Sequence, residues 1–350
     1  MRLTARIMLI ECDVLPGLKP FLEQEIVERF GKKARIIKDN DNEAVRLEFS
    51  GELADLLGLR VAAAVYDLES FDIRGPNALL KDNNFVRIVT AIKKAEALHE
   101  PGAFKSFRFS AAGHTTQVFK DLRKDIALVT GLKYEDDDGE MLLRVRPAVI
   151  ARDGWEVLVR LSPRPLSARL WRVVDMPGAL NATIAAAMVM LTDPKPSDRF
   201  INLMSGSGTL LIERGLASPA EKIMGVDNDD KAIGASIKNI RAAGLGQTIK
   251  AMKMNVSALH LPDGGFNKLC ADLPWGQLIG SSEENKELYP IVLTEAARVA
   301  VLGADFIVLT HDMALFERVV RQQEDWILKQ EIQVLQGGQH PKIYHLRRAE

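Results

Sequence analysis

The pattern of hydrophobic and polar positions divides this chain into two halves. From about residue 181 onward, short and almost entirely apolar runs alternate with longer stretches in which apolar residues recur every three or four positions. Such runs are typical of strands buried on both faces, and the intervening pattern is that of amphipathic helices. The strands are predicted at 199–204, 222–227, 249–255, 267–272 and 305–311, and the helices at 208–217, 230–243, 285–300 and 313–323. This alternation predicts a parallel sheet covered by helices on both faces.

Two further strand patterns, at 326–336 and 342–348, are joined by Gly-Gly-Gln-His-Pro. A short connection rich in Gly and Pro predicts a hairpin, so we expect the parallel sheet to finish in an antiparallel pair.

The first half, up to about residue 165, has shorter and more mixed elements. Its patterns predict the order strand, helix, strand, strand, helix, strand at 5–12, 18–31, 34–39, 44–50, 52–60 and 64–71. This order is that of a ferredoxin-like α+β unit. Helices are then predicted at 83–99 and 117–131, and strands at 106–112, 140–150 and 155–162.

Composition narrows the class of protein. The chain has 350 residues, 47% of them hydrophobic, which is enough for two or three domains with their own cores. No run of about 18 apolar residues occurs and the first residues lack the usual signal-peptide pattern, so we expect neither a membrane span nor secretion. Only Cys12 and Cys270 are present, and the histidines show no metal spacing, so we expect a cytoplasmic protein without a metal site. A net charge of −1 means that any basic surface must be local.

The stretch Asn-Leu-Met-Ser-Gly-Ser-Gly-Thr, 202–209, follows the first predicted strand of the second half and opens a helix. Gly206 and Gly208 lack Cβ atoms where a ligand would approach the backbone, and a helix N-terminus offers free N–H groups to a polar edge. The alternative is an ordinary tight turn, because Leu211 holds the place of the third glycine of a dinucleotide fingerprint.

Two later strand ends support the ligand interpretation. Asp227 ends the second strand about 20 residues beyond the glycines, where an acid can accept hydrogen bonds from both hydroxyls of a ribose. Asp229 or Asn228 could cap the following helix, which would leave Asp227 free for the ligand. Asn255 ends the third strand and could reach an adenine edge, or it could simply cap a short turn.

The fourth strand ends in Ala-Asp-Leu-Pro-Trp-Gly, 271–276. A carboxylate and a backbone carbonyl accept hydrogen bonds and so suit an NH₂ donor, while Trp275 offers a face for stacking. The alternative is a strand stop beside a core tryptophan. It does not explain why Asp272 ends an apolar strand next to two other ligand loops at the carboxyl edge of the sheet.

These motifs carry a family resemblance. Asp-Leu-Pro-Trp is similar to the (D/N)-(P/L)-P-(Y/F/W) motif of enzymes that methylate the exocyclic amines of bases. The 202–213 stretch resembles the glycine loop of RNA guanine-N2 methyltransferases that carry a THUMP domain, and 180–191 looks like their N-terminal cofactor helix. The second half thus resembles a Rossmann-like class I methyltransferase domain that uses S-adenosylmethionine. The first half resembles the family's ferredoxin-like plus THUMP module.

The resemblance implies domains at 1–72 (ferredoxin-like), 73–165 (THUMP, RNA-binding) and 181–350 (methyltransferase), with a linker at 166–180. It implies a site with catalytic residues Asp272, Leu273, Pro274 and Trp275. The implied cofactor residues are Asn181, Thr183, Asn202, Ser205, Gly206, Ser207, Gly208, Thr209, Asp227, Asn228, Asn255, Val256 and Asp272. The chain departs from the family pattern at Thr183, Asn202, Leu203, Ser205 and Asn255.

Local clusters of basic residues could supply RNA contacts to phosphates. They are Lys120, Arg123, Lys124, Arg160, Arg164, Arg169 and Arg172. The alternative for the linker arginines is packing of one domain on another.

The resulting hypothesis is a monomeric tRNA guanine-N2 methyltransferase that acts near the acceptor stem. The family implies that its THUMP domain holds the 3′ end of the tRNA. We keep three alternatives: methylation of ribosomal RNA, methylation of an adenine N6 amine, and a non-catalytic RNA-binding protein whose cofactor pocket is degenerate.

Overall fold

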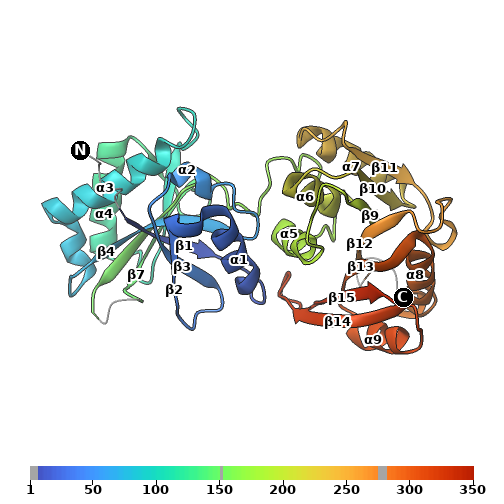
Figure 1. The fold of residues 1–350 in the computed structure, drawn as a ribbon. Coiled ribbons are helices and arrows are strands. Elements are labelled where there is room, and N and C mark those ends of the chain that lie inside the picture. The colour runs from blue at the N-terminus through green and yellow to red at the C-terminus, as the bar shows by residue number, and fades with distance from the viewer. Residues whose placement is uncertain (1–6, 150–152, 275–281) are drawn as a thin grey trace. The chain divides into compact units, whose positions relative to one another are not determined.

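The computed structural model describes residues 7–149, 153–274 and 282–350, and its chain forms two compact units. The first unit comprises Met1–Val14 and Leu22–Ser167, and the second comprises Leu15–Phe21 and Ala168–Glu350. Each unit is built on its own β-sheet (Figure 1).

The sheet of the first unit has eight strands in the order β2-β3-β1-β4-β8-β7-β5-β6. The strands are β1 (Met8–Asp13), β2 (Ala34–Ile37), β3 (Ala44–Phe49), β4 (Ala64–Phe71), β5 (Ser106–Ser110), β6 (Lys133–Tyr134), β7 (Met141–Pro147) and β8 (Trp155–Arg160). The helices are α1 (Lys19–Phe30), α2 (Leu53–Leu56), α3 (Asp82–Glu96) and α4 (Gln117–Thr130), with 3₁₀ turns at Gly31–Lys33 and Pro76–Leu80.

The ferredoxin-like element order is confirmed, because β1 lies between β3 and β4 and pairs antiparallel with both. This unit does not stop at residue 72 as a separate sheet. β4 also pairs antiparallel with β8, from Tyr66 opposite Arg160 to Phe71 opposite Trp155. The two modules predicted for the first half therefore share one continuous sheet.

The sheet of the second unit has seven strands in the order β11-β10-β9-β12-β13-β15-β14. They are β9 (Arg199–Leu203), β10 (Lys222–Asp227), β11 (Ile249–Lys253), β12 (Phe266–Asp272), β13 (Ala300–Thr310), β14 (Trp326–Gln333) and β15 (Lys342–Arg348). The first five are parallel, as predicted. The predicted hairpin is also present, and its second strand, β15, inserts antiparallel between β13 and β14.

Helices cover both faces of this sheet. They are α5 (Ala182–Leu191), α6 (Thr209–Ala217), α7 (Asp230–Ala242), α8 (Ser282–Val299) and α9 (Met313–Arg321), with a 3₁₀ turn at Val256–Ala258. Ile201 and Leu203 of β9 belong to the core cluster that contains α8 and α9. Because side chains alternate along a strand, Asn202 lies on the other face, where α5 and α7 pack against α6. In an open sheet of this kind, ligands bind at the carboxyl ends of the parallel strands.

Candidate active site

The loop between β9 and α6 has an unusual backbone. Met204, Gly206 and Gly208 all have positive φ angles, of 58°, 53° and 86°. A Cβ added to Gly206 would meet nothing within 4 Å, whereas one added to Gly208 would lie 2.5 Å from Ser236 Oγ on α7. The sequence predicts that both glycines make room for a ligand. The structure corrects this for Gly208, whose space is taken by the neighbouring helix, while Gly206 faces open space.

Asp227 at the end of β10 is bonded to this loop. Its Oδ2 accepts a hydrogen bond from Gly206 N (2.8 Å), and its Oδ1 accepts one from Asp229 N (3.0 Å). Asp229 caps α7 by accepting from Lys231 N, as predicted, but the expectation that this leaves Asp227 free is wrong. Each carboxylate oxygen has a second lone pair, so Asp227 can still accept from a hydroxyl. Asn228 beside it is exposed.

Two buried polar atoms lie next to the glycine loop. Asn202 is 1% exposed, and its Nδ2 donates to the carbonyls of Leu203 (3.2 Å) and Cys270 (3.1 Å). Asn202 Oδ1 and Ser205 Oγ have no hydrogen-bond partner among the described residues. A buried polar atom without a partner costs about 1–3 kcal/mol, so this pair suits the polar end of a bound ligand.

The other predicted cofactor residues make local hydrogen bonds. Asn181 Oδ1 caps α5 and accepts from both Thr183 N and Thr183 Oγ1, each at 2.8 Å. Asn255 Oδ1 accepts from Ser257 N (3.0 Å), so it caps the 3₁₀ turn that begins at Val256. A cap on a short turn is the second of the two roles predicted for Asn255. Ser207 and Thr209 are buried. Contacts of these residues with a cofactor stay predictions.

The end of β12 lies at the same edge, since β12 pairs with β9 through Ala271 opposite Leu203. Asp272 is the last residue of the strand and is half-buried. The strand pairing continues one residue further, because Leu273 N donates to Leu309 O (2.9 Å). Trp275 lies outside the described residues, so the structure does not bear on its predicted stacking.

A buried polar network that was not predicted from the sequence follows this motif. The Pro274 carbonyl accepts from Tyr289 Oη (2.7 Å) and from Asn285 Nδ2 (2.9 Å), both on α8. Tyr289 Oη also bonds Thr310 Oγ1 (2.7 Å), which in turn accepts from Asp312 N (3.1 Å). Only the spacing of four between residues 285 and 289 marks them as sharing a helix face.

The linker arginines belong to the second unit. Arg169 Nε donates to Glu213 Oε1 on α6 (2.9 Å). Arg172 Nη2 donates to Leu180 O (2.7 Å) and to Thr209 Oγ1 (3.0 Å), so it ties the linker to the starts of α5 and α6. Burial lowers the pKa of Arg172 from its usual value. These two arginines have packing partners within their own unit, in place of the expected phosphate contacts.

The remaining predicted RNA residues lie in the first unit. Arg160 is 4% exposed and donates to the carbonyls of Ser162, Pro163 and Glu140, so the structure corrects its predicted role from phosphate contact to loop support. Lys120, Lys124 and Arg164 are exposed. Arg123 lies 4.7 Å from the ring of Tyr134.

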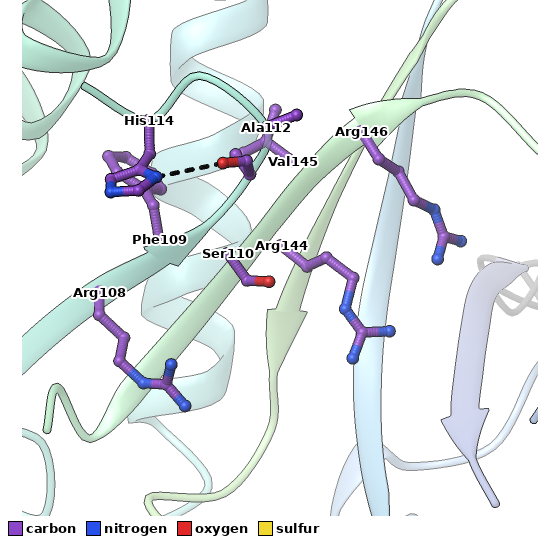
Figure 2. A pocket seen from close by; sticks show the side chains of 9 residues that line it. Arg108, Phe109, Ser110, Ala112, His114, Arg144, Val145 and Arg146 are labelled. Carbon is purple, nitrogen blue, oxygen red and sulfur yellow. Dashed lines mark hydrogen bonds between the residues drawn. The ribbon is translucent and has the colours of Figure 1, made fainter. Parts of the chain in front are cut away.

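A cleft of about 470 Å³ opens in the first unit and was missed from sequence. Figure 2 shows Arg108 on β5 and Arg144 and Arg146 on β7 along its wall, with His114 bonded to Ala111 O. Arg144 and Arg146 are ion-paired with the buried carboxylate of Glu11. The backbone of Arg108 pairs with β7, but its guanidinium forms no hydrogen bond or ion pair within the described part of the chain.

Two searches of the described residues gave negative results. No three His, Cys, Asp or Glu side chains are grouped so that they could hold a metal ion. None of the helices in the described ranges combines the length and hydrophobicity needed to cross a membrane.

Comparison with known proteins gives a family match for the second unit. The family model UPF0020, described as RMKL-like, methyltransferase domain, matches residues 169–342. Over these residues the chain is similar to that methyltransferase domain. The match covers the glycine loop, Asp227 and Asp272, and it confirms the predicted enzyme class.

Two curated relatives match nearly the whole chain. The "tRNA (guanine(6)-N2)-methyltransferase" of Methanocaldococcus jannaschii is 26% identical over 95% of this chain and 97% of its own length. The protein of the same name from Thermus thermophilus is 27% identical over 97% of this chain and 100% of its own length. Among solved structures, TrmN from Thermus thermophilus aligns with a TM-score of 0.75 and 23% identity, covering 97% of this chain and 99% of that one. At this identity the structural match establishes the fold, and it confirms the predicted class I methyltransferase architecture.

Proposed function

We propose that this protein transfers a methyl group from S-adenosylmethionine to the exocyclic N2 amine of a guanosine in tRNA. The observation that carries the proposal is the position of Asp272, in a methyltransferase domain, at the end of the strand beside the glycine loop. Near-full-length similarity to proteins named tRNA (guanine(6)-N2)-methyltransferases supports guanine and tRNA as the target. Their names also favour position 6, which lies in the acceptor stem.

The cofactor would be held at the carboxyl ends of β9, β10 and β11. Asp227 would accept from the ribose hydroxyls, Asn255 and Val256 would lie along the adenine, and Asn202 Oδ1 and Ser205 Oγ would meet the polar methionine end. The buried and unpartnered state of these last two atoms in the described chain supports that fit. When bound, S-adenosylmethionine supplies a methyl group already activated by its sulfonium.

The residues at the end of β12 would orient the target amine. The lone pair of the guanine N2 is delocalised into the ring, which makes the amine a poor nucleophile. If the Asp272 carboxylate and the Leu273 carbonyl each accept one N–H, the lone pair turns toward the methyl group. The same two acceptors stabilise positive charge on nitrogen as the N–C bond forms. The proton released afterwards passes to Asp272 or to water. Alignment is therefore the main task of these residues.

The first unit would bind the RNA as a THUMP-containing module. Lys120, Lys124 and Arg164 are exposed and available for phosphates, and Arg108 in the cleft of Figure 2 adds a cation whose charge no described carboxylate pairs. A paired base cannot reach the end of β12 while stacked, so the target guanosine would leave its helix. We propose that the protein works in the cytoplasm, as a monomer.

The test is methyl transfer to unmodified tRNA from a labelled donor, followed by analysis of the nucleosides. We expect label in N2-methylguanosine, and none with Asp272→Asn, which should still bind the cofactor by calorimetry. Label in adenosine or in ribose would refute the assignment of the amine. Transfer to ribosomal RNA but not to tRNA would refute the assignment of the substrate. Absence of cofactor binding by the wild-type protein would favour a non-catalytic RNA-binding protein.

A further inference from the structure

We propose that Tyr289, Asn285 and Thr310 are positioning residues that fix the direction of the Leu273 carbonyl and thereby the rate of methyl transfer. The proposal rests on the function proposed above, in which that carbonyl accepts an N–H of the target amine. None of the three side chains needs to touch either substrate. They act through the backbone of Leu273 and Pro274, to which their network is bonded.

The hydrogen-bond geometry gives the network one direction. Tyr289 has a single hydroxyl proton, and the Pro274 carbonyl can only accept, so Tyr289 donates to it. Thr310 must then donate to Tyr289 Oη, and its own Oγ1 accepts from Asp312 N. The chain of donors therefore runs from Asp312 through Thr310 and Tyr289 to Pro274. Hydrogen bonds in such a chain polarise and strengthen one another.

Burial keeps this arrangement intact. Tyr289, Asn285 and Thr310 are each 0% exposed, so water does not compete for their hydrogen bonds. Burial also raises the pKa of Tyr289 above its usual value, which keeps the hydroxyl protonated and able to donate.

The network acts on the direction of the Leu273 carbonyl, to which it is not itself bonded. Proline has no N–H, so the carbonyl is the only backbone group through which residue 274 can be anchored by hydrogen bonding. On the other side, Leu273 N is held by Leu309 O. No described residue donates to Leu273 O, which lies between these two anchors. Fixing both sides fixes the direction of that carbonyl, and a misplacement of about 1 Å at a reacting group can cost about a hundredfold in rate.

The chain offers a matched control for removal of the Tyr289 hydroxyl. Tyr344 on β15 is 1% exposed and packs against Phe316, which is also a ring neighbour of Tyr289. Its hydroxyl bonds Glu317 and has no role in the network. Tyr289→Phe and Tyr344→Phe therefore make the same chemical change in the same core, and only the first touches the Pro274 carbonyl.

The experiment measures single-turnover methyl transfer to unmodified tRNA by the full-length protein, with cofactor and tRNA affinities measured separately. For Tyr289→Phe we expect a rate at least tenfold lower, with both dissociation constants within twofold of wild type. Thr310→Val should lose rate in the same way, and Thr310→Ser should recover most of it because the hydroxyl is restored. Tyr344→Phe should keep the wild-type rate. A Tyr289→Phe rate within twofold of wild type, or a loss shared equally by Tyr344→Phe, overturns the positioning role.

A second measurement does not depend on activity. Hydrogen exchange at the Leu273 amide should become faster in Tyr289→Phe and Thr310→Val, but not in Thr310→Ser or Tyr344→Phe. Unchanged exchange in all four variants contradicts the proposal even if the natural substrate has been misassigned. A different outcome separates the two proposals: the wild-type protein methylates no tRNA, but Leu273 exchange still becomes faster in Tyr289→Phe and Thr310→Val. That outcome refutes the proposed function and leaves the network as an anchor of the loop.

Discussion

The two glycines of the cofactor loop should respond differently to the same substitution. Both have left-handed φ angles, so replacing either with alanine costs about 1–2 kcal/mol of folding free energy. At Gly206 that is the whole structural cost, because the new Cβ meets nothing within 4 Å. At Gly208 the Cβ would also lie 2.5 Å from Ser236 Oγ and 3.3 Å from Ser236 Cβ. Overpacking of this kind adds about 1–3 kcal/mol, for a total of roughly 2–5 kcal/mol.

Urea unfolding and cofactor calorimetry separate the two effects. Gly208→Ala should lower the free energy of unfolding more than Gly206→Ala. Gly206→Ala should weaken cofactor binding more, because its Cβ enters the open side of the loop. Adding Ser236→Ala to Gly208→Ala should restore the part of the unfolding free energy that is lost to the clash with Oγ. It should not restore the part that is lost to the left-handed backbone conformation. Equal destabilisation by the two single substitutions, or no recovery in the double variant, would show that the distinction drawn between these glycines is mistaken.

Three further outcomes are expected. Arg172→Gln should weaken cofactor binding by about five- to tenfold, because removing this charged donor leaves the buried acceptors Leu180 O and Thr209 Oγ1, at the starts of α5 and α6, unpaired. The control Arg164→Gln, at an exposed position, should leave cofactor affinity unchanged, and calorimetry measures both affinities. Asp305 is buried, which by itself raises its pKa, but hydrogen bonds from three basic side chains, His345 among them, lower that pKa well below the usual range. Its contribution to stability is therefore complete above the unfolded pKa of about 4 and declines as the pH falls below it. Asp305→Asn should thus cost about 2–4 kcal/mol at neutral pH, with a smaller gap from wild type in unfolding curves at pH 3. Arg108→Gln should weaken tRNA binding and reduce its salt slope by about one, with no effect on cofactor affinity in filter-binding and calorimetric titrations.

The parts of the site that follow from local pattern were predictable. Strand ends, the glycine loop and the acids at 227 and 272 all depend on residues close together in the sequence. The topology rule for parallel sheets then brings their carboxyl ends together. The same local reasoning leaves Asn228 or Asp229 as the cap of α7, and the structure has Asp229 in that role.

Features that depend on distant partners were not predictable. A run of arginines signals charge, but it does not show that Arg160 is enclosed by backbone carbonyls or that Arg169 reaches a buried glutamate. The lack of room for a side chain at residue 208 is due to Ser236, which lies 28 residues away in the sequence and on another helix. Likewise, the sequence does not distinguish Tyr289 and Thr310 from ordinary core residues. Only the structure shows that Tyr289 donates to the Pro274 carbonyl and is bonded to Thr310.

The position of β15 has a consequence for synthesis of the protein. This strand, Lys342–Arg348, is the last one made in the second unit, yet it lies between β13 and β14 in the finished sheet. Until residue 348 has emerged from the ribosome, β13 has an open edge and β14 has no neighbour to hydrogen-bond with. Until β15 is in place, the edge of β13 and the whole of β14 are therefore exposed strand edges, and closure of this side of the sheet waits for β15.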